Sequence, residues 1–237
     1  MKKTKRLILT LLLQFTLLVP NVALAGTVED FGVWGVFIAQ GSLDIVSPKL
    51  QNYRWGLEGQ ARFLDDASDF DTGIIGADLG YALAEDIAFW LGYAWVPTSP
   101  LEKESFDEHR IRQTLTWSTR LKPLTLSSRT RLEQRFLETG DDTGWRFRQL
   151  FKLAYRFPFE ARFSLVGSNE IFFNLNDTDW GAENGFDQNR AFGGFGWSFD
   201  PGRRVSAVIG YLNQYIRKPS TDNRMNHILS ISLLLNF

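Results

Sequence analysis

The sequence predicts an all-β protein, a transmembrane antiparallel up-and-down β-barrel that forms one domain. Two observations favour this fold class. Short segments that alternate apolar and polar residues follow one another from about residue 30 to residue 237, and turn-forming residues separate them. Aromatic residues are abundant, with twenty Phe, eight Trp and six Tyr, as in the interfacial girdles of outer-membrane barrels.

Residues 1–25 have the features of a cleaved secretory signal peptide. Four basic residues precede an apolar run from residue 7 to about residue 19, and Ala23 and Ala25 have the spacing that a signal peptidase requires. A membrane anchor is the alternative, but the apolar run is short for a helical span. We therefore expect a signal peptide over 1–25 and an outer-membrane barrel over 26–237.

The composition excludes several classes of function. The first 25 residues hold four of the 26 basic residues and no acidic ones, so the rest of the chain has 22 basic against 27 acidic residues. This balance argues against a nucleic-acid partner. The chain has no Cys and two His, which leaves no thiolate site and little for a zinc site. We expect no cofactor and no metal.

In the amino-terminal half, each expected strand has one apolar face. Residues 30–40 are apolar and aromatic, residues 53–63 alternate apolar with charged side chains, and residues 75–81 and 87–95 alternate apolar with small side chains. Residues 111–117 alternate apolar residues with Arg and Thr. A shift of register by one residue would expose arginines to lipid at about 2–4 kcal/mol each, so the register is strongly fixed.

The carboxyl-terminal half repeats this pattern more clearly. Residues 124–136 and 145–157 place apolar side chains on one face and basic ones on the other. Alternation continues through residues 163–173, 191–199 and 205–215. The last strand, Met225 to Phe237, alternates over about a dozen residues, which is long enough to cross a bilayer as a tilted strand.

The number of strands is even in bacterial single-chain barrels, and this rule decides between alternatives. Ten strands are clear from Tyr53 onward, and the segment between Asp30 and Gln40 makes eleven. We favour about 12 strands, with Ser42 to Ser47 as a short additional one. The alternative is 10 strands, with the amino-terminal segment inside the lumen.

The carboxyl terminus indicates the direction of the strands. An aromatic last residue, Phe237, resembles the assembly signal of bacterial outer-membrane barrels, which places it in the periplasm. Short turns near Glu85, Pro123 and Pro201 alternate with longer polar loops, as periplasmic turns and extracellular loops do. We expect localisation in the bacterial cell outer membrane. The expected partners are outer-membrane lipid, lipopolysaccharide and the barrel-assembly machinery, and we expect a monomer.

The strand parity directs most of the arginines into the lumen. The expected lumen charge network consists of Arg54, Glu58, Arg62, Asp78, Glu108, Arg110, Arg112, Arg129, Arg131, Glu133, Arg135, Arg146, Arg148, Lys152, Glu170 and Arg190. Same-face neighbours on one strand are about 7 Å apart, and two like charges at that distance repel by roughly 2 kcal/mol at an effective dielectric of 20. Glu133 lies between Arg131 and Arg135 on one strand, so we expect it to bridge them.

Two function classes follow from an arginine-lined lumen. The network can fill the barrel, giving an occluded structural or surface-binding protein, or it can line a narrow porin-like channel for a small anionic solute or another specific solute. An outer-membrane hydrolase is a distant third. His109 and His227 lie on the lipid-facing side, and neither precedes a Ser by two residues as in outer-membrane lipid hydrolases. We therefore assign no catalytic residue.

Several charged motifs are similar to those of one family. Arg129-Thr130-Arg131-Leu132-Glu133-Gln134-Arg135 is followed by Arg146-Phe147-Arg148, Glu170-Ile171-Phe172 and Phe186-Asp187-Gln188-Asn189-Arg190. This order resembles a family of uncharacterised bacterial outer-membrane β-barrel proteins known only as a domain of unknown function. The resemblance covers nearly the whole chain after residue 25. It implies a barrel and no activity.

Overall fold

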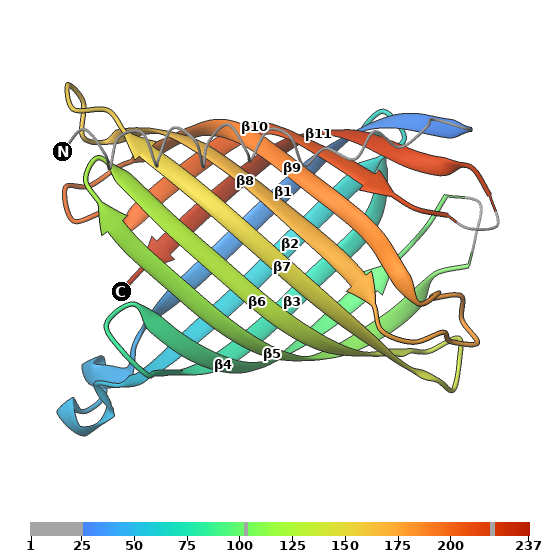
Figure 1. The fold of residues 1–237 in the computed structure, drawn as a ribbon, viewed down its shortest axis with the longest axis horizontal. Coiled ribbons are helices and arrows are strands. Elements are labelled where there is room, and N and C mark those ends of the chain that lie inside the picture. Colours follow the sequence, from blue (N-terminus) through green and yellow to red (C-terminus); the bar gives the residue numbers. More distant parts are fainter. Residues whose placement is uncertain (1–25, 102–103, 219–220) are drawn as a thin grey trace, which may run out of the picture.

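The protein folds into one closed β-barrel of eleven strands (Figure 1). The computed structural model describes residues 26–101, 104–218 and 221–237, so the expected signal peptide lies outside the described residues. The strands are β1 (Thr27–Ser42), β2 (Tyr53–Leu64), β3 (Asp69–Ala82), β4 (Ile87–Thr98), β5 (Phe106–Leu121), β6 (Leu124–Leu137), β7 (Thr143–Arg156), β8 (Phe163–Asn174), β9 (Gly185–Ser198), β10 (Val205–Ile216) and β11 (Asn223–Asn236). Consecutive strands pair antiparallel, which confirms the all-β barrel.

The strand count of 12 is wrong, and so is the alternative of 10. Residues 42–47 form no additional strand. Ser42 is the last residue of β1, and two short 3-10 helices follow it, η1 (Leu43–Ile45) and η2 (Pro48–Leu50). The serines that precede these helices explain the turn, because the Ser42 hydroxyl accepts a hydrogen bond from the Asp44 amide and the Ser47 hydroxyl from the Lys49 amide.

The amino-terminal segment forms part of the wall rather than entering the lumen. β1 pairs with β2 on one side and with β11 on the other. The β1–β11 pair is parallel, and its register runs from Thr27 opposite Asn223 to Gln40 opposite Asn236. A parallel closing pair is what an odd number of up-and-down strands requires, since the first and last strands then run in the same direction.

The barrel has two distinct ends. At the loop end, connections join β2 to β3, β4 to β5, β6 to β7, β8 to β9 and β10 to β11. At the Phe237 end lie η1, η2, the remaining turns and the carboxyl terminus (left in Figure 1). Because β1 and β11 both begin at the loop end, Thr27 and Phe237 lie at opposite ends of the barrel.

Loop length distinguishes the two ends less clearly than the sequence pattern suggests. The connection at 43–52, at the Phe237 end, is as long as the connection at 175–184 at the loop end. The turn at 122–123 is the shortest. The connections at 157–162 and 199–204, at the Phe237 end, have six residues each, against five at 138–142 and six at 217–222 at the loop end. The expected alternation of short turns and long loops is therefore only partly present.

Every strand carries exposed apolar side chains on the outer face of the barrel. Exposed side chains include Leu57, Ile75, Leu91, Leu115 and Phe151, each between 45% and 60% exposed. The inner face carries most of the buried polar and charged side chains, together with a few apolar ones such as the fully buried Ile228. None of the helices within the described residues has the length and apolar character needed to cross a membrane.

Phe237 fixes the end of the β1–β11 seam. Its amide donates to the Gln40 carbonyl at 2.9 Å, and its carbonyl accepts from the Ser42 amide at 3.3 Å. Its ring stacks on Trp55 of β2 with the centroids 6.0 Å apart. The last residue thus contacts both β1 and β2.

Candidate functional site

The interior charges form three groups, of which the first is centred on Glu133. This carboxylate is fully buried, and it pairs with Arg146 and Arg148 of β7 at 2.7 Å each. Arg148 also pairs with Glu170 of β8 at 2.9 Å, and Glu170 accepts from Arg129 at 2.8 Å. We call these residues the Glu133 cluster. Its ion pairs run from β6 across β7 to β8.

Half of the expected bridge between Arg131 and Arg135 by Glu133 is present. Arg131 pairs with Glu133 at 3.9 Å and also donates to the Thr114 hydroxyl at 2.9 Å, whereas Arg135 pairs with Glu108 and not with Glu133. The physical reason is the geometry of a sheet. Residues facing each other on adjacent strands are about 5 Å apart, whereas same-face neighbours on one strand are about 7 Å apart.

Glu108 holds the second group together, nearer the loop end. It accepts from Arg110 of its own strand at 2.7 Å through each oxygen, and from Arg135 of β6 at 2.5 and 3.1 Å. Both guanidinium groups therefore bind this carboxylate through two hydrogen bonds, the strong form of this contact. Glu108 is 3% exposed, so the pairing is shielded from solvent.

Arg112 is the centre of the third group. It is 2% exposed and reaches Glu58 of β2 at 2.5 Å and Asp78 of β3 at 2.7 Å. Glycines make room for these side chains. A Cβ at Gly92 would lie 1.7 Å from the Asp78 carboxylate, and one at Gly76 would lie 2.7 Å from the Arg112 guanidinium. Small residues on β3 and β4 are thus a condition for this group.

Four expected members lack an ion pair within the described part of the chain. Arg54 lies at the Phe237 end and donates to the Ser42 hydroxyl at 3.1 Å and to backbone carbonyls. Lys152 has no carboxylate partner there. Arg62 donates to the Gln60 side-chain oxygen at 2.8 and 3.2 Å, and Arg190 to that of Gln188 at 3.0 Å. Each of these last two arginines is thus held by a Gln two residues earlier.

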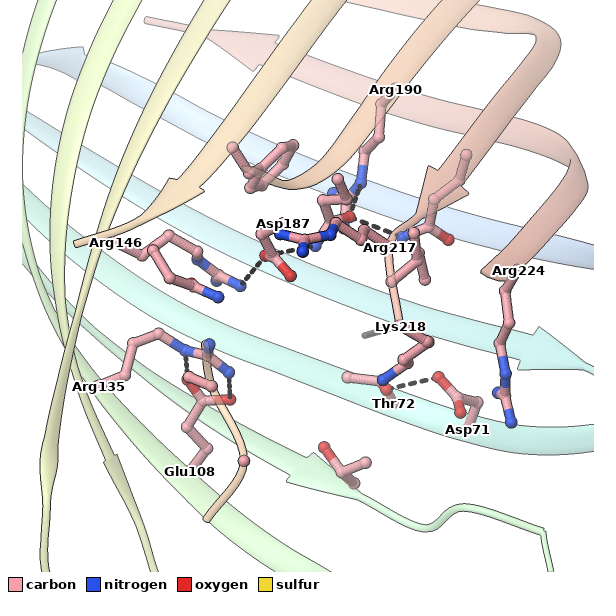
Figure 2. Close-up of a pocket in the computed structure, with 18 of the residues that line it drawn as sticks. Asp71, Thr72, Glu108, Arg135, Arg146, Asp187, Arg190, Arg217, Lys218 and Arg224 are labelled. Carbon is pink, nitrogen blue, oxygen red and sulfur yellow. Dashed lines mark hydrogen bonds and ion pairs between the residues drawn. The ribbon is translucent and has the colours of Figure 1, made fainter. Parts of the chain in front are cut away.

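A cavity of about 380 Å³ lies at the loop end of the interior. The cationic residues that line it are Arg62, Arg110, Arg135, Arg146, Arg148, Arg190, Arg217, Lys218 and Arg224, and the acidic ones are Asp71, Glu108, Glu183 and Asp187. Figure 2 shows Arg135 bound to Glu108 and Arg146 directed toward Asp187, 3.5 Å away. The cavity therefore carries a formal excess of positive charge.

The β8–β9 connection forms part of the cavity wall. Trp180 to Glu183 line it, and the Trp180 indole donates to the Asp142 carbonyl at 2.8 Å. Asp179 accepts from the backbone amides of Asp141 and Asp142 at 2.9 and 3.2 Å, and the Asp142 carboxylate accepts from the Asp179 amide at 2.8 Å. These hydrogen bonds, which we call the loop clasp, join the β8–β9 and β6–β7 connections.

The hydrogen bonds of the loop clasp also lower the pKa of the Asp179 carboxyl. The backbone amide of Asp141 is the main cause that lowers the pKa of the Asp179 carboxyl below its ordinary value of 3.8. A donor directed at the carboxylate stabilises its charged form. The clasp therefore requires an ionised Asp179.

Trp34 of β1 is one of the residues that line the cavity. The Arg62 guanidinium lies 4.2 Å from its ring centroid and that of Arg190 lies 4.9 Å from it. Trp34 is 4% exposed, and its indole Nε1 has no hydrogen-bond partner among the described residues. Both faces of the segment around Trp34 are apolar, so alternation alone could not single out this residue.

Arg217 and Arg224 are further cavity residues that the sequence pattern did not identify. They lie on either side of the β10–β11 connection, beyond the apolar part of each strand, where the parity signal ends. The two histidines are outside the cavity. A hydrogen bond of 2.6 Å joins His109 to Tyr93, and one of the same length joins His227 to Tyr211.

Within the described residues, no three His, Cys, Asp or Glu side chains lie together as a metal site would require. The chemistry available in the cavity is instead that of several guanidinium groups near aromatic rings. Such a site can bind anions, because guanidinium forks match the oxygens of carboxylates and phosphates.

Comparisons with known proteins give a family but no activity. Residues 31–226 match the model of a family described as "Protein of unknown function (DUF2490)". An uncharacterized protein of Methylorubrum extorquens is 34% identical over 182 residues, which cover 76% of this chain and 79% of the relative. No solved structure matches this chain.

Proposed function

Because the chain belongs to the DUF2490 family of proteins of unknown function, we propose a function from its own geometry. The protein is an integral outer-membrane β-barrel whose interior is closed to solutes near mid-height. Its cavity at the loop end binds a ligand at the cell surface. The observation that carries the proposal is the complete burial of Glu133 inside the barrel.

The apolar outer face supports a membrane location. Large apolar side chains such as Leu79, Ile111 and Phe195 are 56%, 41% and 50% exposed along the middle of their strands. Soluble monomers rarely expose contiguous apolar surface of this extent. Aromatic residues lie near both ends, for example Trp95 and Trp145 at the loop end and Trp197 at the other end, as interfacial girdles do.

The Glu133 cluster supports closure. Arg146 and Arg148 are 5% and 8% exposed, Arg112 is 2% exposed and Glu170 is 6% exposed, although all four point into the barrel. A water-filled passage beside these groups would leave their side chains exposed. Eight strands are filled by side chains and sixteen leave a channel, so eleven strands with long arginines can be filled.

A narrow anion-favouring channel is the second candidate. The positive charge of the loop-end cavity favours it, because such a cavity raises the local concentration of anions. Closure near Glu133 argues against it. The two candidates therefore differ in one measurable property, the conductance of the folded barrel.

The test is conductance of the purified protein in planar bilayers. We expect no current steps from the wild type. A triple variant, Glu133→Ala with Arg146→Ala and Arg148→Ala, removes both signs of charge from the cluster and is expected to produce anion-selective steps. The matched control is Arg162→Ala, which removes an exposed arginine at the Phe237 end. Steps from the wild type at the same amplitude as from the triple variant would refute closure.

A further inference from the structure

We propose that Arg62, Arg190 and Trp34 form a binding site for a phosphate-bearing polyanion in the loop-end cavity. The inference deepens the proposed function by naming the class of ligand, and it rests on that function only in using the same cavity. The three residues come from β2, β9 and β1, so the site exists only in the closed barrel.

Unbalanced charge is the first argument. Arg62 and Arg190 both line the cavity, and neither has a carboxylate within ion-pair distance in the described part of the chain. Both guanidinium groups lie over the Trp34 ring, so their Cζ atoms are no farther apart than the sum of 4.2 and 4.9 Å. Two like charges this close in a shielded interior require a counter-charge.

For four other arginines of the cavity, the counter-charge is a carboxylate of the protein. Arg110 and Arg135 share Glu108, and Arg146 and Arg148 share Glu133. In each of these two pairs, both guanidinium groups bind one carboxylate. Arg62 and Arg190 are a third pair, and it has no carboxylate partner among the residues that the structure describes.

The Trp34 indole supplies an independent argument. Its Nε1–H is buried without a partner within the described residues, and a buried donor that makes no hydrogen bond is unfavourable. The site offers the two guanidinium groups, each held by a glutamine, and this donor. A ligand oxygen that accepts from Nε1 removes that cost.

The chemistry of the ligand follows from charge and size. Arg217 and Arg224 also line the cavity without a carboxylate partner in the residues described, so more than one negative charge is needed. A phosphate group carries about −1.5 to −2 at pH 7 and presents three acceptor oxygens. A cavity of 380 Å³ is larger than one phosphate, so a diphosphate or a phosphorylated sugar fits this site.

Two sources could supply such a group, a soluble phosphate compound or a phosphorylated lipid headgroup of the outer leaflet. The chemistry of recognition is shared. The continuous wall separates the cavity from lipid along the strands, so a headgroup has to enter over the loop end.

The experiment is calorimetric titration of the folded barrel in neutral detergent with inorganic pyrophosphate, and separately with inorganic phosphate. We expect pyrophosphate to bind more tightly than phosphate. Arg62→Gln and Arg190→Gln should each weaken pyrophosphate binding about tenfold or more, the effect of losing one charge-assisted contact. Arg162→Gln, an exposed arginine at the opposite end, is the matched control and should bind as the wild type does.

Two further variants are conservative, so that a loss of affinity can be distinguished from a loss of folding. Arg190→Lys keeps the charge and loses the planar fork, so a loss of affinity with an intact barrel supports bidentate binding. Trp34→Phe keeps the ring and removes the Nε1–H, and should weaken binding several-fold. Folding of every variant is checked by heat-modifiable migration.

The outcomes separate this inference from the proposed function. No pyrophosphate binding by the wild type, or equal weakening in Arg162→Gln, would overturn the inference while leaving closure untouched. Pyrophosphate binding by a barrel that conducts would refute closure and leave the site standing. Repeating the titration in phosphatidylcholine vesicles with and without phosphatidic acid assigns the source. Competition by phosphatidic acid supports a headgroup, and its absence supports a soluble ligand.

Discussion

At the scale of single residues, Glu133 shows how a barrel interior can hold many arginines. Desolvating an ion pair costs several kcal/mol, so a buried pair stabilises only when its remaining oxygens are satisfied. Both Glu133 oxygens are satisfied, one by Arg148 and the other by Arg146 through two nitrogens. Removal of this one carboxylate leaves Arg146 with Asp187 at 3.5 Å and Arg148 with Glu170 alone.

We predict that Glu133→Gln destabilises the folded barrel by about 3–5 kcal/mol, the usual cost of breaking a buried ion pair from one side. The measurement is denaturant unfolding in detergent, followed by tryptophan fluorescence. The loss should change little with salt, because buried pairs are screened much less than exposed ones.

The control for this prediction is Glu160→Gln. Glu160 pairs with Arg162 at 3.2 Å, but the two side chains are 35% and 52% exposed. Exposed pairs contribute little, so this variant should unfold like the wild type. Equal destabilisation by the two substitutions would mean that the interior around Glu133 is wide and wet.

The face of each charged residue can be read from the sequence, whereas its partner cannot. Arg146 and Arg148 alternate with apolar residues, and the pleat of a strand places such residues on one side. The partner of Glu133 depends on the stagger between β6 and β7, where Glu133 faces Arg146. The stagger depends on both strands and on the turn between them, so it cannot be predicted from the alternation of residues within one strand.

At the scale of elements, the loop clasp determines the position of Trp180 at the cavity. We predict that Asp179→Ala releases the β8–β9 connection, because the backbone amides of Asp141 and Asp142 lose their acceptor. Hydrogen exchange of these two amides should accelerate by about tenfold or more.

Asp141→Ala is the matched control, since it changes a neighbouring acid whose backbone amide, rather than its side chain, takes part in the clasp. It should leave the exchange of the Asp142 amide unchanged. Equal acceleration in both variants would show that the clasp depends on general loop charge rather than on the Asp179 carboxylate.

The clasp also has a predicted pH dependence. Because the pKa of Asp179 is lowered in the folded protein, its contribution is present at pH above the ordinary value of 3.8 and is lost as the pH falls through the lowered value. Trp180 should therefore keep its environment from pH 8 to pH 5. Its fluorescence should change only below the ordinary value, and a change near neutral pH would contradict this assignment.

At the scale of the whole molecule, the odd strand count fixes the end of the barrel at which β1 starts. β1 starts beside β11 at the loop end. With Phe237 in the periplasm, as we propose, an epitope inserted between residues 25 and 26 should be accessible to antibody on intact cells. A cysteine at Asp141 should react there with an impermeant reagent, and one at Gly202 should react only after the outer membrane is broken.

Accessibility of the epitope only in broken cells, while Asp141 remains reactive, would place residue 26 on the periplasmic side. The parallel seam would then be wrong. A reversed pattern at both cysteines would instead invert the whole barrel.

Eleven strands could be counted from the sequence. We expected 12 or 10 because bacterial single-chain barrels have an even number of strands. Residues 30–40 had the character of a strand, but even-numbered barrels close with an antiparallel pair and an eleventh strand has no such partner. The structure solves this with fourteen parallel residue pairs between β1 and β11. Parallel pairing is slightly less stable per residue than antiparallel pairing. The alternation of residues within one strand does not show whether its neighbour runs parallel or antiparallel.

The parallel seam also limits how this protein can be rearranged. In an even-stranded barrel the two termini meet at one end, so a short linker can join them and new termini can be opened elsewhere. Here a linker from Phe237 back to Thr27 would have to span the length of β11, fourteen residues or roughly 46 Å of extended chain. In lipid, its backbone would need hydrogen-bond partners that only another strand provides. A circular permutant of this barrel therefore has to gain or lose one strand.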